Sequence, residues 1–158
     1  MGNFKAELIK QGDKDLLKLE GHIDEDANLE NIQNGNSSLL EIDFQKVAAI
    51  NSCGIREWIK WLKTIPADKT IHYINCPKII IDQANMVAGF IPENGKIKSF
   101  YVPYYSEASE TEKMILFTEG KDFNGREINA PESIQDEATG EELEMDVIES
   151  KYFKFLKG

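Results

Sequence analysis

The sequence lacks the features that would place it in a membrane or in an oxidising compartment. It has only two cysteines, Cys53 and Cys76, too few for a disulfide framework or, without other ligands, for a zinc site. No apolar run approaches the ~20 residues of a bilayer-spanning helix, and no basic-then-apolar leader opens the chain. We therefore expect a cytoplasmic protein in a reducing environment.

Basic residues are also scarce, above all in the last third of the chain. The formal net charge is -10, and residues 101–158 carry 14 acidic against 6 basic residues. Binding to nucleic acid or to an anionic lipid surface requires clustered Lys and Arg. The composition therefore argues against both partners, and the acidic part would favour a partner of basic character.

What the sequence does contain is the composition of a folded protein. With 158 residues, of which 41% are hydrophobic, it forms one domain, or one domain and a small appendage. Up to residue 102 strand-like and helix-like segments alternate, which predicts an α/β fold: a mixed β-sheet covered by helices. The expected strands are residues 4–8, 15–20, 38–44, 70–75 and 96–102, and the expected helices are 26–33, 55–63 and Pro77 to Gly89.

The pattern changes near Pro103, where we place a boundary between a domain of residues 1–102 and a small β-rich extension of residues 103–158. The extension is expected to be a β-hairpin or ribbon subdomain, with extended segments at 112–118, 143–147 and 152–156 around an irregular stretch. So small a unit has a marginal core of its own. We therefore expect it to dock on the first domain and to melt with it.

The segment from Asp43 to Ile55, which includes Asn51-Ser52-Cys53-Gly54, resembles the signature of STAS domains, a family that includes bacterial anti-sigma factor antagonists. In that family a strand is followed by a loop of the type Asp-Ser-Ser-Gly that opens the next helix. Leu19-Glu20-Gly21-His22-Ile23-Asp24 is similar to the family's second strand and its Gly-x-(Leu/Ile)-Asp loop, at the family's spacing. The resemblance covers residues 4 to about 101.

The resemblance implies a non-catalytic signalling module without a cofactor, which docks a protein partner, often a kinase-like anti-sigma factor. Docking would use Asp24, the Asn51–Gly54 loop and the following helix, beginning with Ile55. In the antagonists the residue before the loop glycine is a serine whose phosphorylation breaks the complex. Here that position is Cys53, and Ser52, one place earlier, is the candidate phosphorylation site.

Physical chemistry alone gives this loop a second interpretation. Free backbone N–H groups at a helix N-terminus attract negative charge, so Ser52-Cys53-Gly54 is also a candidate site for a small anion or nucleotide. No Gly-x-Gly-x-x-Gly or Walker-type loop is present to support nucleotide binding. Ser52 could simply cap the helix.

A third interpretation makes Cys53 a redox switch, because thiols at helix N-termini can be reactive. A catalytic Cys–His pair is not supported, since neither His22 nor His72 belongs to a motif with it. Trp61 lies off the apolar stripe of Ile55, Trp58, Ile59 and Leu62, so it is either a partly exposed interface anchor or covered by the C-terminal segment.

Two short segments of the extension have the layout of a zinc ribbon whose metal ligands have been replaced. The former ligand positions hold Ser106, Ser109, Asp136 and Thr139, which are not the thiolate and imidazole donors of a structural zinc site. We therefore expect no metal here. The ribbon would be held by packing of five side chains: Phe117, Leu143, Tyr152, Phe153 and Phe155.

Overall fold

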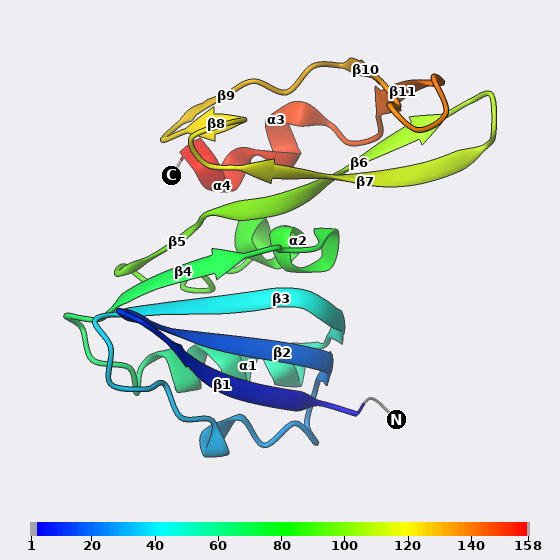
Figure 1. Cartoon of the computed structure of the whole chain (residues 1–158). Coiled ribbons are helices and arrows are strands. Elements are labelled where there is room, and N and C mark those ends of the chain that lie inside the picture. Colours follow the sequence, from blue (N-terminus) through cyan, green and yellow to red (C-terminus); the bar gives the residue numbers. More distant parts are fainter. Residues whose placement is uncertain (1–2, 158) are drawn as a thin grey trace.

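The computed structural model describes residues 3–157, with the side chain of Lys157 left aside. Two β-sheets follow one another along the chain, and Figure 1 shows them as two successive layers of strands. The first sheet holds β1 (Lys5–Gln11), β2 (Lys14–Ile23), β3 (Leu39–Ile50), β4 (Thr70–Ile74) and β5 (Gly95–Ile97), with helices α1 (Ser52–Leu62) and α2 (Lys78–Met86). The second holds β6 (Ser99–Ser106), β7 (Thr111–Thr118), β10 (Ser133–Gln135) and β11 (Glu142–Met145).

The five strands of the first sheet lie side by side in sequence order. β1 and β2 form the predicted antiparallel hairpin around Gly12, and the remaining pairs are parallel. Parallel neighbours need a crossover, and α1 and α2 provide two of them. The predicted fold class, a mixed sheet covered by helices, is confirmed.

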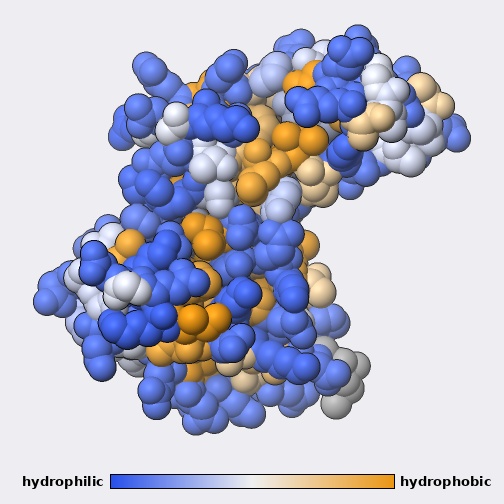
Figure 2. Space-filling model, in the orientation of Figure 1, coloured by the Kyte–Doolittle hydropathy of each residue, from blue (hydrophilic) through white to orange (hydrophobic). Residues whose placement is uncertain are grey.

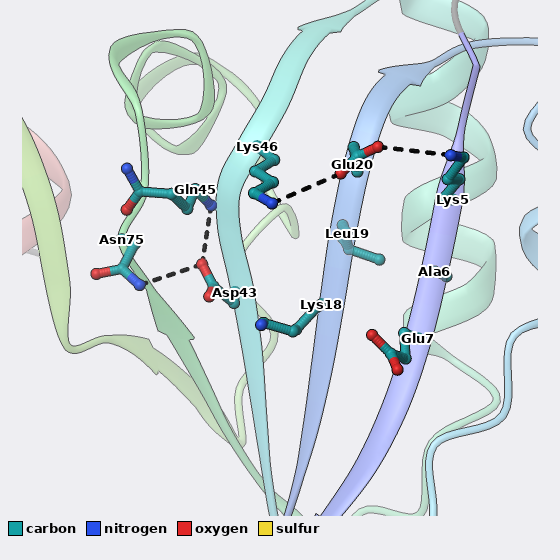
Figure 3. Close-up of a pocket in the computed structure, with 10 residues that line it drawn as sticks. All are labelled: Lys5, Ala6, Glu7, Lys18, Leu19, Glu20, Asp43, Gln45, Lys46 and Asn75. Carbon is teal, nitrogen blue, oxygen red and sulfur yellow. Dashed lines mark hydrogen bonds and ion pairs between the residues drawn. The ribbon is translucent and has the colours of Figure 1, made fainter.

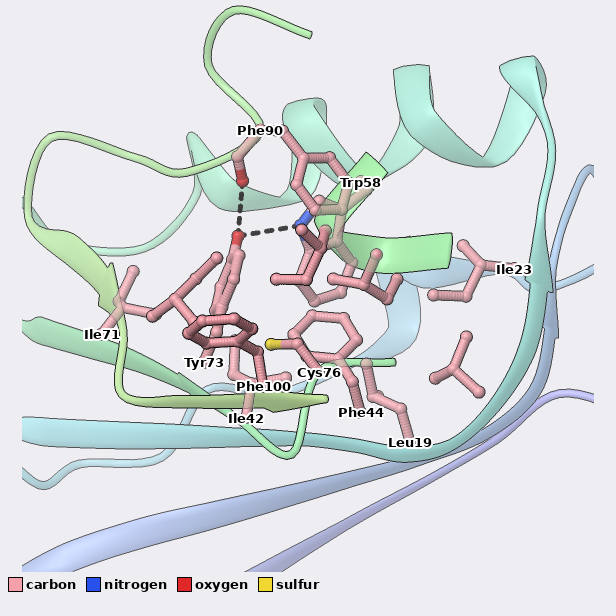
Figure 4. Packing of buried hydrophobic residues seen from close by; sticks show 14 of the residues in the cluster. Leu19, Ile23, Ile42, Phe44, Trp58, Ile71, Tyr73, Cys76, Phe90 and Phe100 are labelled. Atoms are coloured by element: carbon pink, nitrogen blue, oxygen red, sulfur yellow. Dashed lines mark hydrogen bonds between the residues drawn. The ribbon is translucent and has the colours of Figure 1, made fainter. Parts of the chain in front are cut away.

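The core of this first part is built around aromatic side chains at the interface between the sheet and α1. Trp58 Nε1 donates to the hydroxyl of Tyr73 at 3.0 Å, and that hydroxyl donates to the carbonyl of Phe90 at 2.6 Å (Figure 4). The ring of Phe44 packs edge-on against both Trp58 and Tyr73. The two buried polar atoms are therefore satisfied, which burial requires.

Helix α1 begins three residues earlier than predicted, and its buried stripe is rotated. Gly54, Trp58, Trp61 and Leu62 face the protein, whereas Ile55 is only half-buried. Trp61 is 3% exposed, and its indole donates to the carbonyl of Ile32 at 2.9 Å. The prediction that Trp61 is partly exposed was therefore wrong. The alternative prediction, that the C-terminal segment covers Trp61, was also wrong, because the segment that covers it is the connection before β3.

The predicted helix at residues 26–33 was also wrong. Only a single 3-10 turn, η1 (Leu29–Asn31), forms within the long connection from β2 to β3. A buried ion pair fixes this connection: Asp15 and Lys69 lie 3.8 Å apart, each with a side chain 5% exposed. Asp15 accepts from the backbone N–H of Ser37, and Lys69 donates to the carbonyls of Gly35 and Ser37. The connection from β2 to β3 is thus held by this ion pair and its hydrogen bonds rather than by a helix.

The second sheet begins within the segment of residues 96–102, which was predicted to form a single strand. Residues 96–102 form two strands, since the chain leaves the first sheet after Ile97 and β6 enters the second. Pro103 lies inside β6. Residues 152–156, predicted to be extended, run from the end of helix α3 (Glu149–Tyr152) through a turn at Phe153 into helix α4 (Lys154–Lys157). A small third sheet of β8 (Phe123–Asn124) and β9 (Glu127–Ile128) completes this part.

One continuous hydrophobic core joins the two parts. Helix α2 contacts β3 and β6 as well as α3 and α4. The side chain of Asn85 bridges directly, accepting from the N–H of Phe155 and donating to the carbonyl of Tyr152. The aromatic side chains expected to pack within the extension instead gather around a residue of the predicted first domain: the rings of Phe117, Tyr152, Phe153 and Phe155 surround Phe100. Leu143 is buried as well.

Candidate functional site

The two segments that carried the family resemblance meet in space at the N-terminus of α1. The backbone N–H of Asn51 donates to the carbonyl of Ile23 at 3.2 Å. Gly54 packs on the same carbonyl so closely that a Cβ atom at position 54 would lie 1.9 Å from its oxygen. Only glycine fits there. The loop after β2 and the start of α1 therefore form one structural unit.

Asn51 is the N-cap of α1, a role that the sequence interpretation considered for Ser52. Its side-chain oxygen accepts from the backbone N–H of Gly54 at 2.8 Å, which satisfies one of the free donors of the first turn. Its Nδ2 donates to Glu25 Oε2 at 2.9 Å, and this bond lowers the pKa of the Glu25 carboxyl. The prediction that Ser52 caps the helix was therefore wrong.

Asp24 shapes the facing loop. Its carboxylate accepts from the N–H of Asp26 at 3.0 Å, and its carbonyl accepts from Ala27 at 3.1 Å. Between this loop and α1 lies a hollow of about 250 Å³, lined chiefly by charged side chains and by Cys53. The lining residues are Asp24, Glu25, Asn28, Leu29, Glu30, Cys53, Arg56 and Glu57. Four carboxylates against one guanidinium make the hollow acidic, which weakens the case for an anion or nucleotide site.

Ser52 and Cys53 differ in accessibility. Ser52 is exposed at the first position of α1, whereas Cys53 is half-buried, and Arg56 Nη2 donates to Cys53 Sγ at 3.1 Å. His72 lies on β4 between the inward-facing Ile71 and Tyr73, on the side of the sheet away from α1. Cys76 is fully buried against Phe100, and burial raises the pKa of its thiol well above the usual value.

The structure thus brings Asp24, Asn51, Ser52, Cys53 and Gly54 together, with Ile55 beside them on α1, and moves Trp61 into the core. Sequence reasoning missed Glu25 and Arg56. Arg56 had a signal, because it lies one turn after Cys53 on the same helix. The contact of Glu25 with Asn51 spans 26 residues, and no local pattern indicates it.

The predicted ribbon positions lie on two turns that are close in space. Ser106, at the end of β6, donates to the carboxylate of Glu141, which precedes β11. Asp136, in the other turn, accepts from Lys113 of β7 at 2.9 Å. Thr139 makes its contacts within its own turn, whereas Ser109 contacts Ser106 and Thr111 and, like Ser106, helps to lower the pKa of the Glu141 carboxyl across the two turns. A degenerate zinc ribbon stays a prediction.

A second hollow of about 580 Å³ lies on the face of the first sheet away from α1, over β1, β2 and β3. Figure 3 shows that charges of both signs alternate across it: Glu20 lies between Lys5 and Lys46, each 3.9 Å away, and Asp43 accepts from Asn75 at 3.1 Å. This face is a solvated row of alternating charges rather than a selective site.

Within residues 3–157, no three His, Cys, Asp or Glu side chains cluster in a way that could hold a metal ion. None of the helices that the structure describes has the length and apolar character to cross a membrane.

No family model and no curated protein matches the sequence. Three solved chains match the structure, among them an anti-sigma factor antagonist from Mycobacterium paratuberculosis. That match has 11% sequence identity and a TM-score of 0.42, and it covers 49% of this chain and 71% of the other. Similarity at this level carries no weight for function, so the site is interpreted from the contacts of this chain.

Proposed function

We propose that this chain is a non-catalytic, cytoplasmic bacterial signalling module of the anti-sigma factor antagonist type. It docks a protein partner, such as a kinase-like anti-sigma factor, through the Asn51–Gly54 loop and the first turn of α1. The main support is the contact between Gly54 and the carbonyl of Ile23, which joins the two motif loops into one surface.

Charge and exposure support a docking role for this surface. Ser52 is exposed, Ile55 offers a half-buried apolar contact, and the hollow lined by their neighbours Cys53 and Arg56 contains four acidic side chains. A basic partner surface would complement these carboxylates. A phosphate on Ser52 would add about two negative charges next to Asn51, the residue that contacts Glu25, and would change the charge of the docking surface.

A cross-linking experiment tests the proposal. A photoactivatable amino acid replaces Ser52 in one protein and Glu7, on the far side of the sheet, in a matched protein, and cross-linked partners from the native cytoplasm are identified by mass spectrometry. We expect a partner that cross-links at position 52 and not at position 7. The same partners at both positions would contradict a docking surface at α1.

The purified partner then permits a quantitative test. Ser52→Glu and Ile55→Asp should each weaken binding by at least about tenfold, which corresponds to about 1.4 kcal/mol. The free energy of unfolding should change by less than about 0.5 kcal/mol in Ser52→Glu, because the side chain is exposed. Ser109→Glu, the same change in the exposed turn after β6, is the control and should bind normally.

The thiol-switch alternative is favoured by one contact, the donation from Arg56 to Cys53 Sγ. It predicts rapid alkylation of Cys53 at neutral pH in the native protein. Alkylation that requires denaturant would remove this alternative and leave the docking proposal intact.

A further inference from the structure

Strand β7 ends the second sheet, with β6 on one side and no strand on the other among the described residues. It pairs with β6 over eight residues without a bulge, from Thr111 to Thr118. A long, regular edge strand is a template for another strand unless the protein blunts it. The edge of β7 is therefore a candidate for pairing with a further strand.

The hydrogen bonds of β7 show which backbone groups point outward. Beside its end, Glu119 N–H donates inward to Lys98, whereas Thr118 N–H points away from β6 and is capped by Asp122 Oδ2 at 2.8 Å. Inward and outward groups alternate along an antiparallel strand, so Leu116, Met114 and Glu112 also direct their N–H and C=O groups outward. The register agrees, because Met114 lies opposite Pro103, which has no N–H to offer.

In the middle of this edge the exposed side chains are apolar, whereas exposed charges are spread along the other long edge strand, β1. Met114 is 37% and Leu116 39% exposed, and Figure 2 shows hydrophobic side chains in this region of the upper part, beside the notch between the two parts. The edge strand β1 instead carries Lys5, Glu7 and Lys10, charges of the kind that protect a sheet edge. On β7 the exposed charges, Glu112 and Lys113, lie in its first half, and Asp122 covers its far end. The middle of the β7 edge, from Met114 to Leu116, has no such protection.

We propose that β7 pairs antiparallel with β7 of a second copy of this chain, so that the two four-stranded sheets become one continuous sheet. In the register that sets Ile115 opposite itself, Met114 lies opposite Leu116 of the second copy and Glu112 opposite Thr118. Apolar residues then meet apolar ones, and no like charges face each other, as stable cross-strand pairs require. A register shifted by two residues would set Met114 opposite itself but would place the charged Glu112 opposite Leu116 and Lys113 opposite Ile115.

A second copy fits this edge because the arrangement is two-fold symmetric, so that each contact occurs twice. It adds about four backbone hydrogen bonds from the outward groups of Met114 and Leu116. The net charge of -10 opposes the approach of two copies, and salt screens such repulsion. Association should therefore tighten as salt is raised. This inference is independent of the function proposed for α1.

Analytical ultracentrifugation of the full chain from about 1 µM to about 1 mM tests it. We expect the mass to rise from 17.9 kDa towards twice that value, at lower concentration in higher salt. Met114→Pro removes an outward N–H without breaking a bond to β6, and Leu116→Lys places a charge at the contact; both variants should stay monomeric. Ala6→Lys, the same added charge on the β1 edge, should dimerise like the unmodified chain.

Two results would overturn the proposal. The first is a chain that stays monomeric throughout, which would leave the edge to a strand of another protein. The second is a dimer that both β7 variants form as readily as the unmodified chain, which would place the interface elsewhere. Circular dichroism of each variant verifies that the loss of dimer does not come from unfolding.

Discussion

The five-stranded sheet packs one face against α1, a helix of 11 residues, whereas the four-stranded sheet is covered by α3 and α4, of four residues each. Both tryptophans, Trp58 and Trp61, lie on α1 in the first part. The second part depends on aromatic side chains that gather around Phe100, at the junction with the first. The two parts share one continuous core, in which the first part supplies both tryptophans and the second part packs its aromatic rings against the junction. The second part is therefore expected to be stabilised by docking.

The largest expected effect comes from the junction itself. Phe100 is fully buried, and Phe100→Ala should cost about 3–5 kcal/mol, which lowers the melting temperature by about 10 °C in a chain of this length. Tryptophan fluorescence reports the first part alone, and far-UV circular dichroism reports both. If the two parts melt as one unit, both signals should shift together.

Met86→Ala serves as the control, because Met86 is 71% exposed on the neighbouring helix α2 and should change stability by less than about 0.5 kcal/mol. The expectation would be contradicted if the melting temperature from fluorescence stayed unchanged while circular dichroism showed an additional transition at lower temperature. The two parts would then unfold separately.

An intermediate effect is expected within the first part, where the Asp15–Lys69 ion pair anchors the connection before β3. The N–H of Ser37, 2.9 Å from the carboxylate, is the main cause that holds the pKa of Asp15 below its usual value. A lowered pKa stabilises the fold above the unfolded value of about 4 and loses that contribution as the pH falls through the folded value. Asp15→Asn should cost about 2 kcal/mol at pH 7.

Urea unfolding at several pH values measures this contribution. The difference between the unmodified chain and Asp15→Asn should shrink as the pH falls below about 4. Glu20→Gln, which removes the exposed ion pairs of Glu20 with Lys5 and Lys46, should cost less than about 1 kcal/mol. A difference that is constant from pH 7 to pH 2 would show that packing, and not the carboxylate charge, gives Asp15 its role.

The first part was the more predictable from sequence, for reasons that particular residues make clear. The β1–β2 hairpin follows from alternation around Gly12, and the order of strands and helices predicts the mixed sheet. The stripe on α1 was misplaced because Gly54, which carries no side chain, faces the core. Whether Trp61 is covered depends on the carbonyl of Ile32, 29 residues away, and local periodicity does not contain that information.

The second part was harder because its pattern is ambiguous at short range. Residues 96–102 look like one strand, and only the tertiary structure shows that the chain changes sheets at Lys98. Tyr152, Phe153 and Phe155 are aromatic and favour strands, but they pack against Phe100 from two helical turns. Tertiary packing overrides propensity in such short elements. At the site, the motif residues were predictable, whereas Glu25 was not.

The smallest expected effect concerns the site and should stay within the first part. Asn51→Ala removes the cap on Gly54 and should cost about 1 kcal/mol. Asn51→Asp keeps an acceptor for Gly54 but cannot donate to Glu25, and it adds a like charge there. Amide hydrogen exchange should then rise at residues 24–27 in both variants and at the first turn of α1 mainly in Asn51→Ala. Faster exchange in β6 or β7 would instead mean that the cap stabilises the junction between the two parts as well.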